Sequence, residues 1–591
     1  MTERRRPLRH VFQGLTVVGA VAIAGGLIPS LGLGPLSASA QTGATVEPPG
    51  IHGTATLARV VNVSQLGHQG AAASDAATPG ATGSTVGAHA MPLRPAPAGA
   101  AGAGSSGASA QVAAPSAAPK VGGDSLTTGS LLQSFEGINS TQNLQTSHVG
   151  LEPPDEGLAE GDGYVVNIVN LAFSVYNSSG VTLGGPFSVD AFFGHPQAFT
   201  HGSLTSDPRV YFDPSTGRWF STVLEYFSAP ATPASQEDIA VSQTSNPLGN
   251  WDIYHINSTD PSDNGCPCFG DYPILGIDAY NFYLETQEFS ITGSAYNGAQ
   301  IYALPKSTLE SGASTVRLVH YGNLSIAGVL SYHIQPAVNP YATSEFFLMS
   351  LDPNGTFDNR LSVWAISNPS QVGGGGIPTL SAMVISSETY GFPVNAVTPP
   401  GFNGFTGEAT TGLVTPDFDA MEQVQNFDNN LYGALNTAVT IPGDTSERDG
   451  VAWFEIHPTL YGGVLSGATM VAQGYLAVAG EYLLYPVIAH NSQGDTALAF
   501  SYGGPSTYLS SGYAVMASGQ TSFGPVQTAA SGVAPDNGFT GTKEFGGVGR
   551  WGDYSAWALD PSGNFWLATQ YIPGNGDQIA NWGNRVFEVG G

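Results

Sequence analysis

Six ionisable side chains stand beside the starts of recurring apolar runs, and two arginines are close to them in sequence. Carboxylates that converge on one point repel each other, so such a set needs a cation, shared protons or neighbouring arginines. Hard oxygen ligands of this type suit calcium. The pattern predicts a ligand-binding site made of Asp155, Asp207, Arg209, Asp271, His333, Glu422, Arg550 and Asp553. Four of these, Asp155, Asp207, Asp271 and Asp553, form the predicted calcium site.

Two other roles for these carboxyl groups stay open. An Asp before Pro, or in a Gly-Asp-Tyr turn, caps a strand by accepting backbone N–H bonds and needs no ligand. Paired carboxylates also perform glycoside hydrolysis, one as acid and the other as base or nucleophile. For that chemistry the candidates are Asp207 and Asp271. The sequence contains no phosphate loop, dinucleotide fingerprint, nucleophile elbow or zinc-protease helix.

Two further motifs could bind metal or form a covalent link. Cys266 and Cys268 are separated by one proline, and we predict a tight local disulfide, with free thiols or a soft-metal pair as alternatives. His195 and His201 flank an aromatic residue on a loop, but the sequence names no third ligand. We therefore expect these histidines to belong to a surface loop.

The elements that must position these residues recur as a repeat. A short polar residue or Tyr, usually followed by Pro, precedes an apolar run, an Asp- or Asn-led turn and an aromatic-rich run. The signature returns roughly every 65 residues, with one doubled gap. Each unit holds four strand-length runs rich in β-branched and aromatic residues, as in Arg209–Phe212, Trp219–Tyr226, Asp238–Gln243 and Trp251–Ile256. This predicts an all-β, seven-bladed β-propeller over residues 130–591.

The last unit supplies only three runs, while Leu131–Ile138 has no partner of its own. We therefore expect this N-terminal run to pair as the outer strand of the last blade and close the ring. Two packed β-sandwiches are the alternative architecture, but they would not explain the repeat.

Several phrases resemble those of large secreted bacterial β-propeller proteins, most of them uncharacterised. The phrases are Pro153-Pro154-Asp155-Glu156-Gly157, Ser206-Asp207-Pro208-Arg209-Val210, Gly270-Asp271-Tyr272-Pro273 and Arg550-Trp551-Gly552-Asp553-Tyr554-Ser555. The resemblance covers roughly residues 130–591. It implies the propeller fold and an extracellular location, and it brings no established reaction.

The N-terminal part predicts export. Residues 1–40 combine a basic start, an apolar stretch and the exit Ala38-Ser39-Ala40, which is typical of a cleavable signal peptide, with a retained anchor as the alternative. Residues 41–129 are rich in Ala, Gly, Pro and Ser and lack aromatic side chains, which predicts a flexible, disordered stalk. The mature protein is thus expected to be secreted, extracellular or at the cell surface, without a transmembrane span.

The net charge of the chain restricts the kinds of partner that it can bind. The 591 residues carry 16 basic and 45 acidic side chains, for a net charge of −29, so nucleic acid and anionic membranes are not expected as partners. We expect a monomeric binding or scaffold module for a polar ligand, an extracellular glycan or a protein at the channel mouth. The alternative is a carboxylate-dependent glycoside hydrolase or lyase, similar to propeller sialidases.

Overall fold

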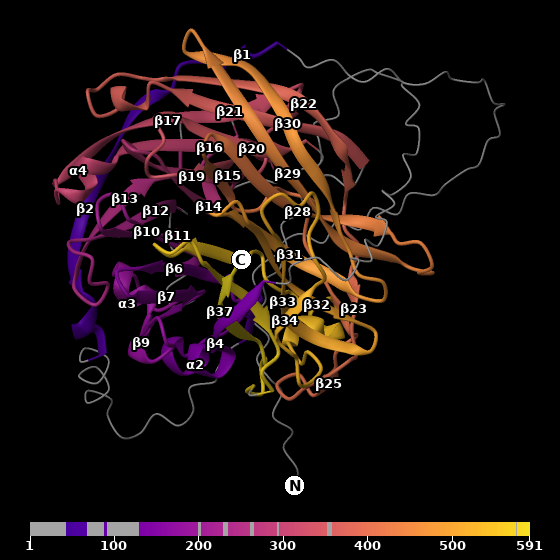
Figure 1. The fold of residues 1–591 in the computed structure, drawn as a ribbon. Helices are drawn as coiled ribbons and strands as arrows, with labels where there is room; N and C mark the ends of the chain where they lie inside the picture. Colours follow the sequence, from indigo (N-terminus) through magenta and orange to yellow (C-terminus); the bar gives the residue numbers. More distant parts are fainter. Residues whose placement is uncertain are drawn as a thin grey trace, which may run out of the picture. The chain divides into compact units, whose positions relative to one another are not determined.

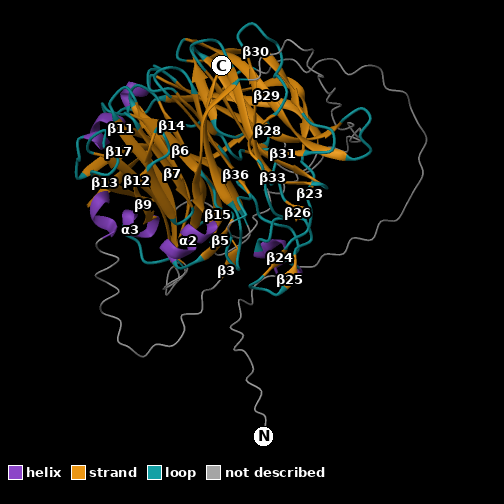
Figure 2. Ribbon diagram, turned by 60° about the horizontal axis from the view of Figure 1, so that its bottom comes forward, coloured by secondary structure: helices purple, strands orange, loops and turns teal. Residues whose placement is uncertain are grey.

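A computed structural model gives the arrangement of the strands (Figure 1). It describes residues 43–67, 88–90, 129–198, 203–227, 234–260, 265–291, 295–351, 357–574 and 576–591. The predicted signal peptide and much of the predicted stalk lie outside these ranges. The predicted all-β class is confirmed, because strands make up nearly all of the regular structure (Figure 2). No helix in the described ranges is both long enough and apolar enough to cross a membrane.

Within the described residues, antiparallel pairings join the strands in seven groups of four, called sheets 1 to 7 in chain order. Sheet 1 consists of β6 (Gly157–Gly161), β7 (Tyr164–Val169), β8 (Ala172–Asn177) and β9 (Thr182–Ser188). Sheet 2 consists of β10 (Ser203–Asp213), β11 (Arg218–Phe227), β12 (Ala234–Ser242) and β13 (Asn250–Asn257). Sheet 3 consists of β14 (Cys268–Ile277), β15 (Asn281–Ser290), β16 (Tyr296–Pro305) and β17 (Thr315–Ile326).

The remaining sheets follow the same pattern. Sheet 4 consists of β19 (Gln335–Val338), β20 (Glu345–Ser350), β21 (Phe357–Ser367) and β22 (Thr379–Gly391). Sheet 5 consists of β27 (Val424–Phe427), β28 (Asn430–Thr440), β29 (Glu447–Tyr461) and β30 (Val464–Leu476). Sheet 6 consists of β31 (Tyr482–His490), β32 (Thr496–Gly504), β33 (Thr507–Met516) and β34 (Gln527–Ala530). Sheet 7 consists of β35 (Ala556–Leu559), β36 (Phe565–Tyr571), β37 (Gly583–Gly590) and β4 (Ser130–Asn139).

The first strands of the sheets contact one another in order, β6, β10, β14, β19, β27, β31 and β35, and β35 in turn contacts β6. Apolar side chains fill every junction between successive sheets, including the junction of sheet 7 with sheet 1. There Leu158 and Val165 pack with Trp566 and Val586. β4 pairs antiparallel with β37, so a strand from the start of the described core completes the last sheet. The core is therefore a cycle of sheet-on-sheet contacts.

Short elements connect and cover the sheets. The helices are α2 (Ser140–Ser147), α3 (Val189–Phe193) and α4 (Lys306–Glu310), with single 3-10 turns η1 (Val63–Gln65), η2 (Pro369–Gln371), η3 (Phe539–Gly541) and η4 (Lys543–Phe545). β18 (Val329–Leu330) pairs antiparallel with the end of β17, and β3 (Ala88–Ala90) pairs with β5 (Gly150–Glu152). Between sheets 4 and 5, two small hairpins pair β23 (Ala396–Val397) with β26 (Leu413–Val414) and β24 (Phe402–Asn403) with β25 (Glu408–Ala409).

A segment of the predicted stalk forms a strap across the outer edges of three sheets. β1 (Thr45–Val46) pairs with β22, and β2 (Ile51–Asn62) pairs first with β17 and then with β13. The stalk prediction is therefore wrong for this segment. Its composition is too poor in large apolar residues to form a core by itself, but the sheet edges supply hydrogen-bond partners that a free chain lacks. Figure 1 shows β2 along the outside of the sheets.

Ala55 marks the place where the strap passes from one sheet edge to the next. It is fully buried among Ile256, Val316 and Leu318, whereas Ala58 on the same strand is exposed. Ala55→Asp would put a carboxyl group into this apolar junction, and we expect it to lower the free energy of unfolding by about 3 kcal/mol. Urea denaturation measures the change.

Ala58→Asp is the matched control, because it introduces the same side chain on the same strand at an exposed position. It should leave stability within about 0.5 kcal/mol of the parent protein. Equal, small effects of the two substitutions would show that the strap does not contribute to the stability of the core.

Candidate functional site

In several sheets the first strand contains a residue with left-handed backbone, and this residue belongs to the motif that recurs in the sequence. Asp207, Tyr272 and Tyr485 have φ values of 56°, 57° and 52°, and a proline follows each of them. At each place the strand pairing shifts, as between Ser206 and Arg209 on β10. Proline cannot donate to a strand ladder, so it fits a bulge, and a bulge redirects a side chain. The recurring motif of Asp or Tyr followed by Pro therefore indicates these bulges.

Asp155, His333 and Asp553 have left-handed backbone as well, with φ values of 50°, 54° and 74°. Non-glycine residues adopt this conformation at a cost, and such positions gather at functional sites. Electrostatic contacts join the predicted residues into one group, called here the mouth cluster. The mouth cluster comprises Asp155, Asp207, Arg209, Asp271, His333, Glu422, Arg550 and Asp553.

Arg209 occupies the middle of the mouth cluster. Its Cζ lies 3.1 Å from the centre of the Tyr554 ring and 5.1 Å from that of Tyr272. The Tyr554 hydroxyl donates to the Pro208 carbonyl at 3.0 Å, and the Tyr272 hydroxyl donates to the Asp553 carbonyl at 2.7 Å. A guanidinium between aromatic faces is stabilised by cation–π attraction. These contacts tie sheets 2 and 3 to the segment that precedes sheet 7.

Asp155, just before β6, and Asp207, at the bulge within β10, are almost inaccessible to solvent. Burial, and to a lesser extent the charge of Asp271, raise the pKa of Asp207 to about 7, while a hydrogen bond from Ser206 opposes the shift. Burial also raises the pKa of Asp155 well above its usual range, and the nearby charge of Asp553 adds to that effect. Asn170 links the pair, donating to Asp155 Oδ2 at 2.6 Å and accepting from the Asp207 N–H at 2.9 Å. Near neutral pH this region therefore holds protons on its carboxyl groups.

Arg550 binds the carboxylate of Asp553 through one nitrogen, at 3.0 and 2.9 Å from the two oxygens. Burial, and then the positive charge of Arg209, lower the pKa of His333 to about 3, so the imidazole is neutral. Burial raises the pKa of Glu422 well above its usual range, against the opposing charge of Arg209. The mouth cluster thus mixes protonated acids, a neutral imidazole and two guanidinium groups.

Several buried polar atoms in this cluster have no hydrogen-bond partner among the described residues. They are Asp155 Oδ1, Arg209 Nε, His333 Nδ1, Glu422 Oε2 and Oδ1 of the neighbouring Asp417. Buried polar atoms are nearly always paired, and such a concentration indicates that water or a polar ligand completes the network. These unpartnered atoms include both hydrogen-bond acceptors and a donor, so the molecule that pairs with them must be able to donate and to accept hydrogen bonds.

The predicted calcium ligands have other partners. Asp553 is paired with Arg550, and the two oxygens of Asp207 accept from the Ser206 hydroxyl at 2.6 Å and the Tyr272 N–H at 3.1 Å. Asp155 keeps one unpartnered oxygen. Arginine pairing and the raised pKa values of Asp155 and Asp207 therefore account for most of the neutralisation that converging carboxylates need, and a calcium ion would have to displace these bonds.

Sequence reasoning missed four contributors to the mouth cluster. Tyr272 and Tyr554 were read only as part of repeat phrases, and Asn170 and Asp417 were not singled out. Asp417, with a φ of 56°, precedes sheet 5, where the sequence pattern indicated only Glu422. The neighbouring Tyr-Pro and Asp-Tyr phrases in the repeat were the available signal, because a bulky residue before Pro in a strand already indicates a bulge.

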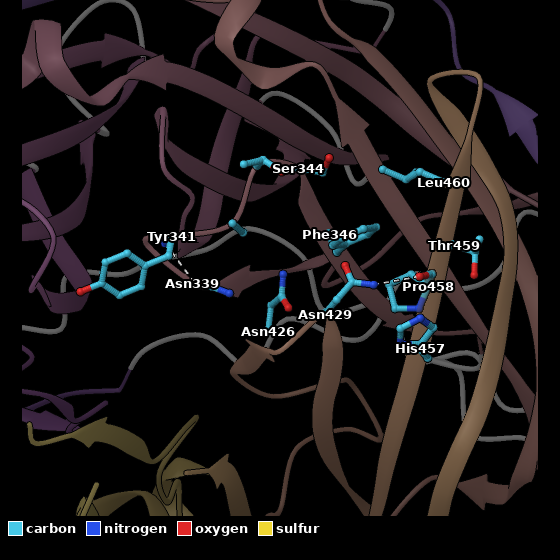
Figure 3. Close-up of a pocket in the computed structure, with 12 residues that line it drawn as sticks. Asn339, Tyr341, Ser344, Phe346, Asn426, Asn429, His457, Pro458, Thr459 and Leu460 are labelled. Atoms are coloured by element: carbon cyan, nitrogen blue, oxygen red, sulfur yellow. Dashed lines mark hydrogen bonds between the residues drawn. The ribbon is translucent and has the colours of Figure 1, made fainter. Parts of the chain in front are cut away.

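The described cavities lie mostly at the other ends of the inner strands. A cavity of about 620 Å³ is lined by the ends of β6, β10, β19, β27 and β35, with Phe212, Tyr341 and Trp557 among its walls. A groove of about 480 Å³ adjoins it between sheets 4 and 5. Figure 3 shows Asn429 beside Pro458 and His457 in this groove, and Asn429 Nδ2 donates to the Pro458 carbonyl at 3.2 Å. None of the mouth-cluster residues lines these two cavities.

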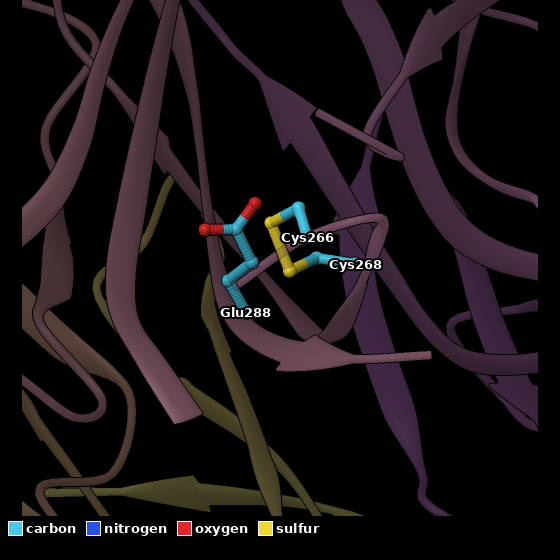
Figure 4. Close-up of side chains that lie close together, drawn as sticks. All are labelled: Cys266, Cys268 and Glu288. Carbon is cyan, nitrogen blue, oxygen red and sulfur yellow. A yellow bond between two sulfur atoms is a disulfide. The ribbon is translucent and has the colours of Figure 1, made fainter. Parts of the chain in front are cut away.

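Cys266 and Cys268 are joined by a disulfide, the first of the three options that the sequence left open. Glu288 lies beside it (Figure 4), and Asn297 Nδ2 donates to the two sulfur atoms at 3.2 and 3.0 Å. Because the sulfurs are bonded to each other, they are not available as thiolate ligands for a metal.

The surface-loop prediction for His195 is wrong. Its side chain is 5% exposed and contacts the carboxyl groups of Glu225 and Asp238. His201 lies outside the described residues. Sequence could not show this contact, because Glu225 and Asp238 belong to strands of the next repeat unit.

No family model and no curated protein matches the chain, so the resemblance to secreted bacterial propeller proteins remains a prediction. Solved structures give remote likenesses. A protein of unknown function from Dyadobacter fermentans has 10% identity and a TM-score of 0.29, covering 66% of this chain and 96% of its own. A Hadza microbial sialidase has 9% identity and a TM-score of 0.33, covering 72% and 73%. Trypanosoma rangeli sialidase has 8% identity and a TM-score of 0.31, covering 69% and 56%. Similarities this remote do not assign an activity to the chain.

Buried carboxyl groups around the centre predict an unusual dependence of stability on pH. Burial raises the pKa values of Glu237, Glu285 and Glu345 well above their usual range. Such groups are protonated in the folded chain and ionise only on unfolding at neutral pH. Their stabilising effect is therefore fully present below about pH 4 and is lost as pH rises through the folded pKa values. We expect the melting temperature to fall steadily from pH 5 to pH 8.

The double variant Glu237→Gln with Glu285→Gln should flatten this slope, because an amide keeps the shape and does not ionise. Glu544→Gln, at an exposed position, is the control and should leave the slope unchanged. A melting temperature that rises between pH 5 and pH 8 would contradict the protonated state of these groups.

Proposed function

We propose that this chain is a secreted seven-bladed propeller that binds a polar, hydroxyl-rich ligand of the glycan class at the mouth cluster. Support for the ring comes from the cyclic contacts of the inner strands and from the pairing of β4 with β37. Secretion and removal of residues 1–40 rest on the N-terminal sequence pattern.

One observation carries the binding proposal: the unpartnered buried polar atoms of both kinds at the mouth cluster. Sugar hydroxyls both donate and accept hydrogen bonds, so they can satisfy Glu422 Oε2 and Arg209 Nε together. Asp271, Tyr272 and Asp553 are partly exposed and give a ligand access to the buried groups. Backbone held by left-handed bulges keeps the side chains in place before the ligand arrives, which reduces the ordering cost of binding.

A glycan array followed by calorimetry with the best ligand tests this. Glu422→Gln and Asp155→Asn should each weaken binding by about tenfold, since each changes a hydrogen bond to a buried, strongly polar atom. Glu447→Gln serves as the control, and melting curves show that each variant is folded. If Asn429→Ala in the groove of Figure 3 abolished binding while the mouth variants retained it, the proposed site would be wrong.

Glycoside hydrolysis is the second candidate. It is favoured by one observation, the raised pKa of Asp207, about 7, beside the carboxyl groups of Asp271 and Asp553. In such hydrolysis a protonated carboxyl protonates the leaving oxygen, while an ionised one attacks the anomeric carbon or activates water. Turnover of a chromogenic glycoside that Asp207→Asn and Asp271→Asn abolish would establish the enzyme. Binding with no turnover on a full panel would leave a binding module.

Calcium at the mouth cluster remains a prediction with its own test. A bound ion would raise the melting temperature at neutral pH by mass action, and the effect would vanish at pH 3, where carboxyl groups are protonated. Asp155→Asn should remove the effect, because Asp155 holds the unpartnered oxygen. Unchanged melting with calcium or with chelator at neutral pH would leave the aspartates as hydrogen-bonded strand caps.

A further inference from the structure

A second cluster of ionisable side chains lies in the junction between sheets 1 and 2 and shares no residue with the mouth cluster. His195 follows α3, and its Nδ1 contacts Glu225 on β11 while its Nε2 contacts Asp238 on β12. His255 on β13 contacts the other oxygen of Asp238 through Nδ1. The nearest ligand atoms of His195, Glu225 and Asp238 all lie within 4.8 Å of one another. The two imidazole rings have their centres 6.0 Å apart.

The strand register puts these side chains on one face of sheet 2. Asp238 pairs with Val223 on one side and His255 on the other, and Glu225 pairs with Gln236 in the next row. Further along the same face, Val223, Ala240 and Ile253 belong to the apolar core between sheets 1 and 2. The sequence therefore replaces the end of an apolar layer with two carboxylates, two imidazoles and an amide.

The charges of this cluster need compensation. The side chains of Glu225 and Asp238 are fully buried, and their ion pairs within the described residues are with histidines. Arg59 reaches this corner but donates to the Ala191 carbonyl. Burying an anion without a partner is costly, so the carboxylates need either protonated imidazoles or a bound cation.

A third buried carboxyl group, that of Asp190, lies beside the same histidine and increases the shortage of positive charge in this cluster. Asp190 is 3% exposed, and its charge acts on His195. Its Oδ2 accepts from the Ala198 N–H at 2.8 Å, while Oδ1 has no hydrogen-bond partner among the described residues. Three acidic side chains surround one imidazole that could carry a single positive charge.

We propose that this cluster binds a divalent first-row transition metal, with zinc as the best-matched ion. Two of the ligands are His195 Nε2 and the Asp238 carboxylate. The third is His255 Nδ1, which now contacts the other oxygen of Asp238 and lies outside the group whose ligand atoms are within 4.8 Å of one another, so its partly exposed side chain has to turn toward His195 when the ion binds. Glu225 accepts a hydrogen bond from His195 Nδ1–H, which is the usual carboxylate support for a metal-bound imidazole. Imidazole nitrogen and carboxylate oxygen together suit zinc and its neighbours better than calcium.

Two features complete the site. The Gln236 amide lies 3.2 Å from Asp238 Oδ1 and 3.3 Å from His255 Nδ1, and after exchange of its two terminal atoms its oxygen can serve as a fourth ligand. The His255 side chain is 32% exposed, which gives an ion access from solvent. The bound metal would link the segment after α3 to two strands of sheet 2, β12 and β13.

The test uses the full chain, stripped with chelator and then titrated with Zn²⁺ or Co²⁺ at neutral pH. We expect one equivalent to bind, a visible absorption band from four-coordinate Co²⁺, and a higher melting temperature. Glu225→Gln should weaken binding by about 10- to 100-fold, because it acts through His195. His255→Ala removes a ligand at a partly exposed position, where folding should be preserved, and should abolish the cobalt band.

His52→Ala on the exposed part of the strap is the matched control and should bind metal as the parent chain does. Absence of the cobalt band from the parent chain would overturn the proposal, and so would unchanged affinity in His255→Ala. The cluster would then be a hydrogen-bonded network in which hydrogen bonds to Asp238 and Glu225 outweigh burial and raise the pKa of His195 to about 9. These outcomes do not depend on whether the mouth cluster binds a glycan.

Discussion

The neutralisation of buried carboxyl groups is the constraint on which the structure depends. The chain has 45 acidic and only 16 basic side chains, yet many acidic groups lie inside the core. Few can be paired with a cation, as Asp553 is with Arg550 and Asp213 is with Lys306 at 2.7 Å. Most of the others depend on burial, which raises their pKa values and keeps them protonated. A core of this kind is compatible with mildly acidic surroundings.

The scarce guanidinium groups occupy the positions where several chain segments meet. Arg209 lies close to the rings of Tyr554 and Tyr272, so one cation contacts residues from two repeat units other than its own. The strained bulges bring these side chains inward, and the cyclic contacts of the inner strands prevent them from relaxing outward. Rigidity at the centre and the unpartnered atoms there arise from the same arrangement, because packed strands cannot shift to pair every polar group.

The outer edges of three sheets are covered by strands from the N-terminal part of the chain. Unpaired edge strands invite association with other chains, and β1 and β2 cover the edges of β22, β17 and β13. The His195 cluster lies near the same corner, since His255 on β13 pairs with Thr56 of the strap. The strap and the histidine-carboxylate cluster thus both hold sheet 2, one by backbone hydrogen bonds and the other through side chains.

Local patterns in the sequence were enough to predict the strands, their grouping in fours and the polar residues at or near the starts of the inner strands. Alternation, β-branched runs and the residue-proline repeat are properties of neighbouring residues, so Asp155, Asp207 and Asp553 could be selected without a structure. The partners of those residues could not be predicted. The sequence does not show that Arg550 pairs with Asp553, that Asp207 holds a proton, or that His195 meets Asp238 from the next repeat unit. Nor does it show that a strand poor in large apolar residues binds the sheet edges. Each of these depends on distances between segments far apart in the chain and on the exclusion of water, and only the assembled tertiary structure sets both.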